Sequence, residues 1–294
     1  MRIKPLFSRF QKAGPLLLLA LILLFSACTR VEKAPELSWD PDVRYPLSVT
    51  FFNLGKADCM VLKTPNGCVV IDTGRNSDGD DIAEALHEMG VTEIDCLFIT
   101  HFDKDHVGGA DRILKEFPVK TIYEPDYPSE TKQTAQYRKA IPETTNVVRL
   151  SENNAFTVDG IRYSVDVGDG AYEPKNLDNN SSLVILAEIG SVSFLFAGDV
   201  EKDRLLEMLY EDFPVCTVLK VPHHGQESKN LKNFFERVRP SAAVITSGNE
   251  DLEAESVVRD LESIGTDVYL TRKGRVEIIT DGTGIFCRQL NRKP

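Results

Sequence analysis

The alternation of short apolar runs with longer amphipathic stretches predicts an α/β fold for most of this chain. Runs such as 47–54 and 68–72 have the length and the β-branched composition of strands. The stretch 80–89 has apolar residues at helical spacing and ends at Gly90, as helices often do. With 42% hydrophobic and 27% charged residues, the chain has an ordinary globular composition, which excludes disordered and fibrous classes.

The same patterns place the remaining elements in order along the chain. Further strands are expected at 59–62, 96–100, 182–189, 192–197, 215–221, 242–247, 267–270 and 275–279. Further helices are expected at 201–210 and 252–264. The turn at 65–67 makes the opening strands antiparallel. The polar stretch 123–145 is expected to be an insertion that faces a substrate.

The N-terminus has the pattern of an export signal over residues 1–27, in which four basic residues precede an apolar run at 16–25. An uncleaved membrane anchor is the alternative, although the run is about half of the ~20 residues needed to cross a bilayer. Residues 25–28 resemble a bacterial lipobox, which implies a lipid anchor on Cys28 and a protein held at the outer face of the membrane. Phe25 stands where leucine is usual, which leaves ordinary cleavage and secretion open.

Residues 28–46, with three prolines and alternating charge, are expected to form a tether, and residues 47–294 the folded domain. Removing residues 1–27 takes away four positive charges and no negative ones, which changes the net charge from −11 to about −15. Such acidity does not favour a polyanionic partner, and no feature of the sequence indicates a protein partner.

Five cysteines follow Cys28 at irregular spacing, which argues against a disulfide framework, although a bridge between Cys59 and Cys68 remains open.

Four of the five histidines fall in two tight clusters, at 101–106 and 223–224. In the first cluster His101, Asp103, Asp105 and His106 offer four potential ligands within six residues, between a predicted strand and two glycines. Imidazole and carboxylate together suit zinc, manganese or iron. The alternative is a solvated polar turn without a metal, but the predicted strand before the segment and the two glycines after it favour a metal site.

The segment 101–106 resembles the HxHxDH signature of the metallo-β-lactamase superfamily, in the HxDxDH form of ComEC-type competence hydrolase domains and of surface phosphorylcholine esterases. The resemblance implies a four-layer αβ/βα sandwich with two metal ions at one edge, between two β-sheets. Asp103 stands where the second histidine is usual. The segment 69–74 resembles the first motif of the superfamily, in which Asp72 would orient the metal-binding loop without binding metal.

Two later segments resemble further motifs of the superfamily. The apolar run at 194–198 ends in Asp199, which would bridge both metals. The segment 219–225 resembles the last motif in its ComEC-type form, which implies one histidine as ligand and the other as a residue acting on the substrate. The sequence alone does not distinguish them, and we favour His224 as the ligand and His223 as catalytic. Lys220 is a candidate to contact a substrate anion, although a lysine at a strand edge would look the same.

The superfamily usually has another histidine roughly twenty residues before the bridging Asp, and this sequence has none there. We expect Asp178 to replace it, with Asn180 as a polar helper, although an Asn-rich hairpin turn is the alternative reading. The resemblance then implies this metal centre: His101, Asp103 and Asp178 at site one, Asp105, His106 and His224 at site two, and Asp199 as the bridge. Its carboxylate content favours manganese more than is usual in the superfamily, although zinc remains the default.

The resemblance implies a hydrolase in which two divalent cations lower the pKa of a shared water, with Asp105 as a candidate to take its proton. The implied substrate is a phosphodiester, either DNA or a smaller ester such as phosphorylcholine. A non-catalytic surface binding lipoprotein is the alternative of another class, and metal content with hydrolysis of a model diester would discriminate it. The acidic net charge opposes DNA unless a local basic patch overrides it. The candidates for such a patch are Lys232, Arg237, Arg239, Arg272, Lys273 and Arg275.

Overall fold

The computed structural model describes residues 33–38, 40, 43, 45–169, 172, 177–211 and 213–291. The chain divides into units of residues 1–30 and 31–294, and every described residue belongs to the second unit. The expected signal segment 1–27, the lipidation residue Cys28 and part of the expected tether lie outside the described residues. Within the described part of the chain, none of the helices has the length and apolar character needed to span a membrane.

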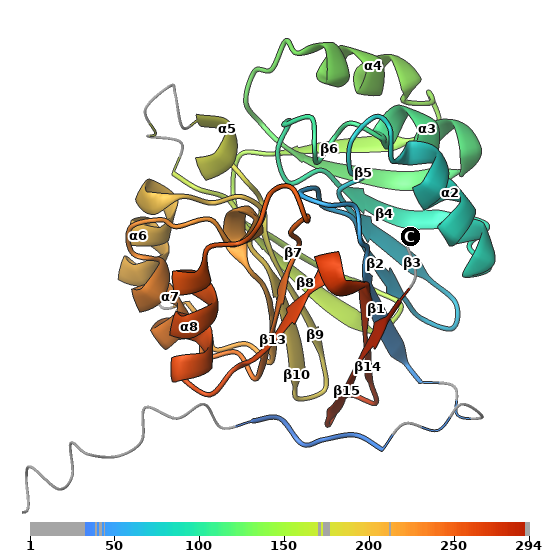
Figure 1. The fold of residues 1–294 in the computed structure, drawn as a ribbon. Coiled ribbons are helices and arrows are strands. Elements are labelled where there is room, and N and C mark those ends of the chain that lie inside the picture. The colour runs from blue at the N-terminus through green and yellow to red at the C-terminus, as the bar shows by residue number, and fades with distance from the viewer. Residues whose placement is uncertain are drawn as a thin grey trace, which may run out of the picture. The chain divides into compact units, whose positions relative to one another are not determined.

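Two β-sheets form the centre of this unit (Figure 1). The first sheet has the spatial order β15 (Ile285–Leu290), β14 (Arg275–Thr280), β1 (Leu47–Phe51), β2 (Met60–Lys63), β3 (Cys68–Ile71), β4 (Ile94–Phe98), β5 (Val119–Pro125) and β6 (Asn146–Leu150). The second has the order β13 (Asp267–Leu270), β12 (Ala242–Ile245), β11 (Val218–Lys220), β10 (Val192–Phe196), β9 (Val184–Ile189), β8 (Ile161–Asp166) and β7 (Asn154–Val158).

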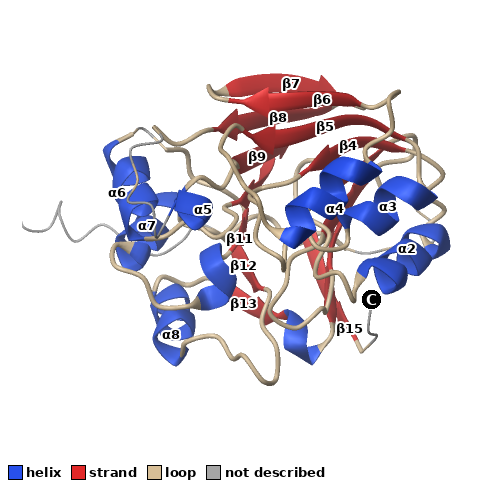
Figure 2. Cartoon of the chain, turned by 90° about the horizontal axis from the view of Figure 1, so that it is seen from above, coloured by secondary structure: helices blue, strands red, loops and turns tan. Residues whose placement is uncertain are grey.

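Helices cover the outer face of each sheet (Figure 2). The first sheet is covered by α2 (Gly79–Glu88), α3 (Ala110–Glu116) and α4 (Lys132–Ala140). The second is covered by α6 (Lys202–Tyr210), α7 (Leu231–Val238) and α8 (Glu255–Ser263). Three short elements are α5 (Leu177–Asn180), η2 (Pro222–Gly225) and η3 (Thr271–Lys273). The expected four-layer αβ/βα sandwich is therefore confirmed.

The alternation of side chains along each central strand explains the layers. In β3, Val69 and Ile71 enter the core between the two sheets, whereas Cys68 and Val70 enter the core beneath α2, α3 and α4. In the second sheet Phe194 packs between the sheets, and its neighbour Leu195 packs beneath the other helices. Because both faces of these strands are buried, the sequence shows continuous apolar runs there.

The stretch 123–145, which is expected to face a substrate, includes the end of β5 and the helix α4, whose Tyr137 is fully buried against the first sheet. The cysteines of the described region are free thiols, so no bridge joins Cys59 to Cys68. Both are buried apolar residues beside β2 and β3, and burial raises the pKa of the Cys68 thiol to about 12, which makes it inert.

The topology brings several strand ends to one edge of the sandwich. β3 runs parallel to β4, and β10 runs parallel to β11, so the carboxyl ends within each pair lie side by side. The amide of Leu183, just before β9, donates to the carbonyl of Thr100, just after β4, at 2.9 Å and ties the two sheets together there. Polar residues that follow these strands are thereby gathered at one place.

Candidate metal centre

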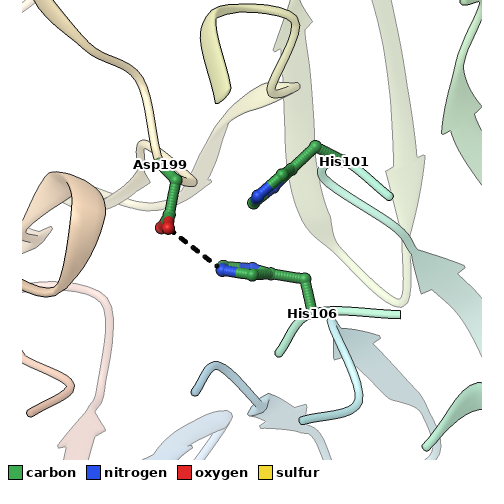
Figure 3. Close-up of side chains that lie close together, drawn as sticks. All are labelled: His101, His106 and Asp199. Carbon is green, nitrogen blue, oxygen red and sulfur yellow. Dashed lines mark ion pairs between the residues drawn. The ribbon is translucent and has the colours of Figure 1, made fainter. Parts of the chain in front are cut away.

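The loop after β4 delivers two buried histidines to this edge, His101 and His106 (Figure 3). Neither side chain has any exposed area, and their ring centroids are 4.0 Å apart. The Nδ1 atom of His101 lies 3.1 Å from the Thr100 hydroxyl and 3.3 Å from the Ser182 hydroxyl. These contacts fix the ring so that its Nε2 atom faces the centre of the site.

Asp72, directly after β3, orients this loop. Its carboxylate is fully buried and accepts hydrogen bonds from the Thr100 amide at 2.8 Å and the Thr100 hydroxyl at 2.7 Å. It also lies 2.8 Å from Nδ1 of His106, which places the proton on Nδ1 and directs the Nε2 lone pair inward. Asp72 has a φ of 58°, a left-handed conformation that few non-glycine residues adopt.

The glycines after His106 allow the loop to pack against the turn that contains Asp72. A Cβ atom at Gly108 would lie 2.3 Å from the carbonyl oxygen of Lys104, and one at Gly109 would lie 2.3 Å from that of Thr73. Neither distance is compatible with a side chain. The two glycines are therefore required by the close approach of two backbone segments.

Asp199 and His224 approach His106 from the second sheet. Oδ2 of Asp199, after β10, lies 3.3 Å from Nε2 of His106 and 3.1 Å from Nε2 of His224 (Figure 3 shows the first of these). Nδ1 of His224 donates to the carbonyl oxygen of Thr246 at 3.0 Å, which leaves Nε2 for the site. His224 is fully buried and has a φ of 52°, again in the left-handed region.

These residues fit a divalent metal. The Nε2 atoms of His101, His106 and His224 are buried, and none makes a hydrogen bond within the described part of the chain. Such atoms are rare in proteins unless an ion or a functional group satisfies them. Ligand atoms lie within 4.8 Å of one another in four sets: His101, His106 and Asp199; Asp105, His106 and His224; Asp58, Asp72 and His106; and Asp58, Asp199 and His224.

The pKa shifts reflect the same crowding of charge. Burial would lower the pKa of His106, but Asp199 and Asp72 outweigh it and raise the pKa above its usual value. Burial would raise the pKa of Asp199, but His224, His106 and Lys220 outweigh it and hold the pKa well below its usual range. The site therefore favours ionised carboxylates and compensating positive charge, which a cation supplies.

The ligands expected for site one converge less tightly. Oδ2 of Asp103 lies 3.7 Å from Nε2 of His101, and its side chain is 42% exposed. Asp178, in α5, is exposed and belongs to none of the converging ligand sets found among the described residues. The two carboxylates are nevertheless neighbours, because burial and the charge of Asp178 together raise the pKa of Asp103 to about 6. Asn180 is buried, and its Oδ1 accepts from the Glu201 amide at 3.0 Å, which holds the start of α6.

Tyr127, which the sequence reasoning did not single out, lies between the metal loop and Asp178. Its hydroxyl accepts a hydrogen bond from the Phe102 amide at 2.9 Å, and burial together with the nearby charge of Asp178 raises the pKa of Tyr127. Its ring packs on Phe102 with the centroids 5.0 Å apart. A tyrosine in a Pro- and Glu-rich stretch carries no spacing that would have revealed this role.

His223 lies at the mouth of the site, in contrast to its buried neighbour His224. Its side chain is 23% exposed, and its Nδ1 lies 3.3 Å from the Glu201 carboxylate. Oε1 of Glu201 also accepts from the Asn179 amide group at 3.0 Å. Burial lowers the pKa of His223, and the nearby charges of His224 and Lys56 lower it further. The imidazole is thus kept neutral and oriented.

Lys220 does not lie at a strand edge or at the mouth. β11 is an interior strand, and the lysine side chain is fully buried. Its Nζ donates to the carbonyl oxygen of Gly198 at 3.0 Å, lies 3.4 Å from Oδ1 of Asp199 and forms an ion pair with Asp58. Burial would lower the pKa of Lys220, but Asp58 and Asp199 outweigh it, so the lysine stays charged.

Asp58, in the loop between β1 and β2, is a buried carboxylate that sequence reasoning missed. It has no exposed area, and its Oδ1 lies 3.4 Å from Nδ1 of His224. Its amide donates to the carbonyl oxygen of Asp105 at 3.0 Å, and its carbonyl oxygen accepts from the Gly74 amide at 2.7 Å. An isolated acidic residue next to a strand is common in loops, and only the fold shows that this one lies beneath the site.

Comparison with known proteins gives a consistent result. A sequence model of the metallo-beta-lactamase superfamily matches residues 53–248, about two thirds of the chain. ComE operon protein 3 of Bacillus subtilis (strain 168) is 29% identical over 224 residues, covering 69% of this chain and 28% of that protein. Competence protein ComA of Neisseria gonorrhoeae is 26% identical over 207 residues, covering 68% and 27%. The chain thus spans less than a third of the length of these relatives.

Solved structures show the same fold. The metallo-beta-lactamase fold protein YhfI from Bacillus subtilis superposes with a TM-score of 0.55 at 9% identity, covering 83% of this chain and 100% of that chain. The E377D mutant of CmlA beta-hydroxylase gives a TM-score of 0.55 at 12% identity, covering 83% of this chain and 55% of that one. At these identities the likeness concerns the fold alone.

Proposed function

The chain belongs to the metallo-β-lactamase superfamily, and from that premise we propose that it is a metal-dependent phosphodiesterase with a dinuclear centre. The observation that carries the proposal is the convergence of three buried imidazole Nε2 atoms, which make no hydrogen bond within the described residues, with the carboxylates of Asp105 and Asp199. His101 and Asp103 would hold one ion, and Asp105, His106 and His224 the other, with Asp199 between them. Asp178 is the proposed third ligand of the first ion.

Two divalent cations in this position supply an activated water and neutralise the charge that develops on a phosphoryl oxygen. The chain's own residues then have separate tasks. Asp105, whose side chain is 18% exposed, lies on the open side of the ligand set and can accept a proton. His223 uses Nδ1 for Glu201, so its Nε2 is the nitrogen that can exchange a proton with a leaving group.

The choice of a phosphodiester rests on three supports. The HxDxDH segment resembles the competence-type hydrolases, and Competence protein ComA of Neisseria gonorrhoeae is similar over 68% of this chain. The carboxylate-rich ligand set favours hard metal ions. Hard ions bind oxygen ligands, such as the phosphoryl group of a substrate, in preference to sulfur. Lys56 is half-buried, and its positive charge lowers the pKa of His223, so it is near enough to the site to attract a substrate anion.

A small diester is favoured over DNA by the charges of the described surface. Of the six basic residues that could form a nucleic-acid patch, Lys232 lies 3.4 Å from Asp260, and Arg272 is bound by both carboxylate oxygens of Glu253. These pairings reduce the positive charge available to a polyanion. A second candidate, hydrolysis of an extracellular nucleic acid, is supported by the competence-related names of the relatives.

The experiment compares three substrates with purified zinc- or manganese-loaded protein: bis-p-nitrophenyl phosphate, p-nitrophenyl phosphorylcholine and single-stranded DNA. We expect hydrolysis of the first two. Two variants separate the histidines, since His224→Ala should lose bound metal, whereas His223→Ala should keep it and lose turnover. Cleavage of DNA alone would favour the nuclease, and metal-loaded protein inactive on all three would remove the enzymatic proposal in favour of a binding role.

We also propose that the domain acts at the outer face of a membrane, held by a lipid on Cys28. The support is the basic and apolar pattern of residues 1–27 and the lipobox-like residues 25–28. Labelling of cells with a radioactive fatty acid tests it directly. Wild-type protein should carry label and Cys28→Ser should not, and an unlabelled wild-type protein would contradict the anchor.

A further inference from the structure

Lys220 and Asp58 form a buried pair against the metal centre. Asp58 lies within 4.8 Å of ligand atoms of Asp199 and His224, but its carboxylate is engaged by the lysine. Both are fully buried, and together they form an ion pair that is electrically neutral. Charged side chains are rarely buried without a functional or structural reason, because desolvation costs more than one ordinary contact returns. The position of this pair beneath the metal centre therefore calls for a role there.

The two oxygens of Asp199 face different partners. Oδ1 lies 3.4 Å from Nζ of Lys220, on the protein side. Oδ2 lies 3.3 Å and 3.1 Å from the Nε2 atoms of His106 and His224, on the side where the ligands converge. Oδ2 is therefore the oxygen that faces the histidine nitrogens that can bind a cation.

Lys220 is held in this position from both sides. Its strand β11 pairs in parallel with β10, so that Lys220 stands opposite Phe196, and its Nζ donates to the carbonyl oxygen of Gly198 at 3.0 Å. On the other side Asp58 pairs with the lysine, and its backbone is hydrogen-bonded to the backbone of Asp105 and of Gly74. The lysine thus cannot turn toward the mouth without breaking these contacts.

We propose that Lys220 and Asp58 are a positioning pair. Lys220 keeps Oδ1 of Asp199 in contact with its ammonium group, so that Asp199 would join the two metal ions through Oδ2 alone. The pair also supports His224, since Oδ1 of Asp58 lies 3.4 Å from its Nδ1. Because its charges cancel, it fixes geometry without changing the net charge of the centre. This inference rests on the dinuclear centre proposed above and assigns Lys220 no contact with substrate.

A crystal structure of the zinc-loaded chain tests the arrangement directly. We expect Oδ2 of Asp199 to contact both ions and Oδ1 to remain within hydrogen-bond distance of Nζ of Lys220. An Asp199 that binds one ion through each oxygen, or a Lys220 that has turned away from it, would overturn the proposal. This result does not depend on whether any variant folds.

Variants test the energetic side with zinc affinity and thermal unfolding as readouts. Lys220→Met and Asp58→Asn each leave one buried charge without its partner, so each should lower Tm strongly. The double variant removes both charges and should recover most of the Tm, yet bind zinc at least tenfold more weakly, since partners of metal ligands are typically worth 10–100-fold in affinity. Lys115→Met, which breaks an exposed pair with Asp111, is the matched control and should change neither.

Each result for the double variant either supports the positioning role of the pair or overturns it. A double variant that binds zinc like the wild type would reduce the pair to a structural role and overturn the proposal. A double variant no more stable than the single variants would show that the two charges do not compensate each other, which also overturns it. Zinc binding is measured without substrate, so a wild type that binds two zinc ions but cleaves no phosphodiester would refute the proposed function and leave this inference standing.

Discussion

Substitution of Asp72 by Asn would change one buried oxygen to nitrogen and keep the shape of the side chain. In the wild type the carboxylate accepts three hydrogen bonds, two from Thr100 and one from Nδ1 of His106. An amide group facing His106 would donate instead, so the imidazole would carry its proton on Nε2. That tautomer has no lone pair for a metal.

The magnitude follows from the contacts that are lost. Hydrogen bonds to charged groups are worth about 1.5–3 kcal/mol each and those between neutral groups about 0.5–1.5 kcal/mol, so loss of the charge from all three bonds should lower the free energy of unfolding by roughly 3 kcal/mol. Zinc affinity should fall about 10–100-fold, as it does when such partners of ligating histidines are removed. Urea unfolding and a competition titration with a zinc chelator measure the two effects.

Asp159→Asn is the matched control. Asp159 also has a positive φ, 43°, which Asn tolerates, and its carboxylate accepts a hydrogen bond from the Thr64 hydroxyl in a hairpin turn outside the ligand set. It should leave zinc affinity unchanged. If Asp72→Asn bound zinc as tightly as the control, the reasoning that Asp72 sets the tautomer of His106 would be refuted.

Three further predictions concern different parts of the molecule. Asp178→Ala should lower metal occupancy at one of two sites, as measured by elemental analysis, and unchanged occupancy would remove Asp178 from the ligand set. Gly109→Ala places a Cβ atom 2.3 Å from a backbone carbonyl oxygen and should abolish metal binding, whereas Gly90→Ala, with nothing within 4 Å, should cost only about 1 kcal/mol of stability from its positive φ. Burial alone would raise the pKa of Glu253, but the ion pair with Arg272 lowers it, so this stabilisation is present above its unfolded pKa and is lost as pH falls through the folded value. Glu253→Gln should therefore cost about 1–2 kcal/mol in urea unfolding at pH 7 and progressively less as the pH falls through the folded pKa, and a difference independent of pH would contradict the assignment.

The sequence predicts the strands whose apolar runs end directly before a candidate ligand. The apolar run before His101 and the run before Asp199 are central strands whose ends carry ligands, so a strand pattern followed by polar residues was enough to place them. The outer strands β6 and β7 were not predicted, because β7 in particular alternates between exposed and half-buried residues and resembles a polar loop.

The candidate site was predictable where ligands are clustered in sequence and was not where the fold alone brings residues together. His101 to His106 and His223 with His224 form recognisable clusters. Asp58 and Tyr127 are single residues in loops, and their positions beside the site depend on strand pairing over long sequence separations. Lys220 was recognised as a candidate, but its burial depends on β11 having neighbours on both sides, which no local pattern indicates.

Titration of the metal-depleted protein with zinc or manganese, while hydrolysis of bis-p-nitrophenyl phosphate is followed, tests the central claim most directly. A dinuclear centre predicts that activity rises with added metal and reaches its maximum at two equivalents per chain. Absence of hydrolysis at every metal loading, or full activity with no bound metal, would contradict the account.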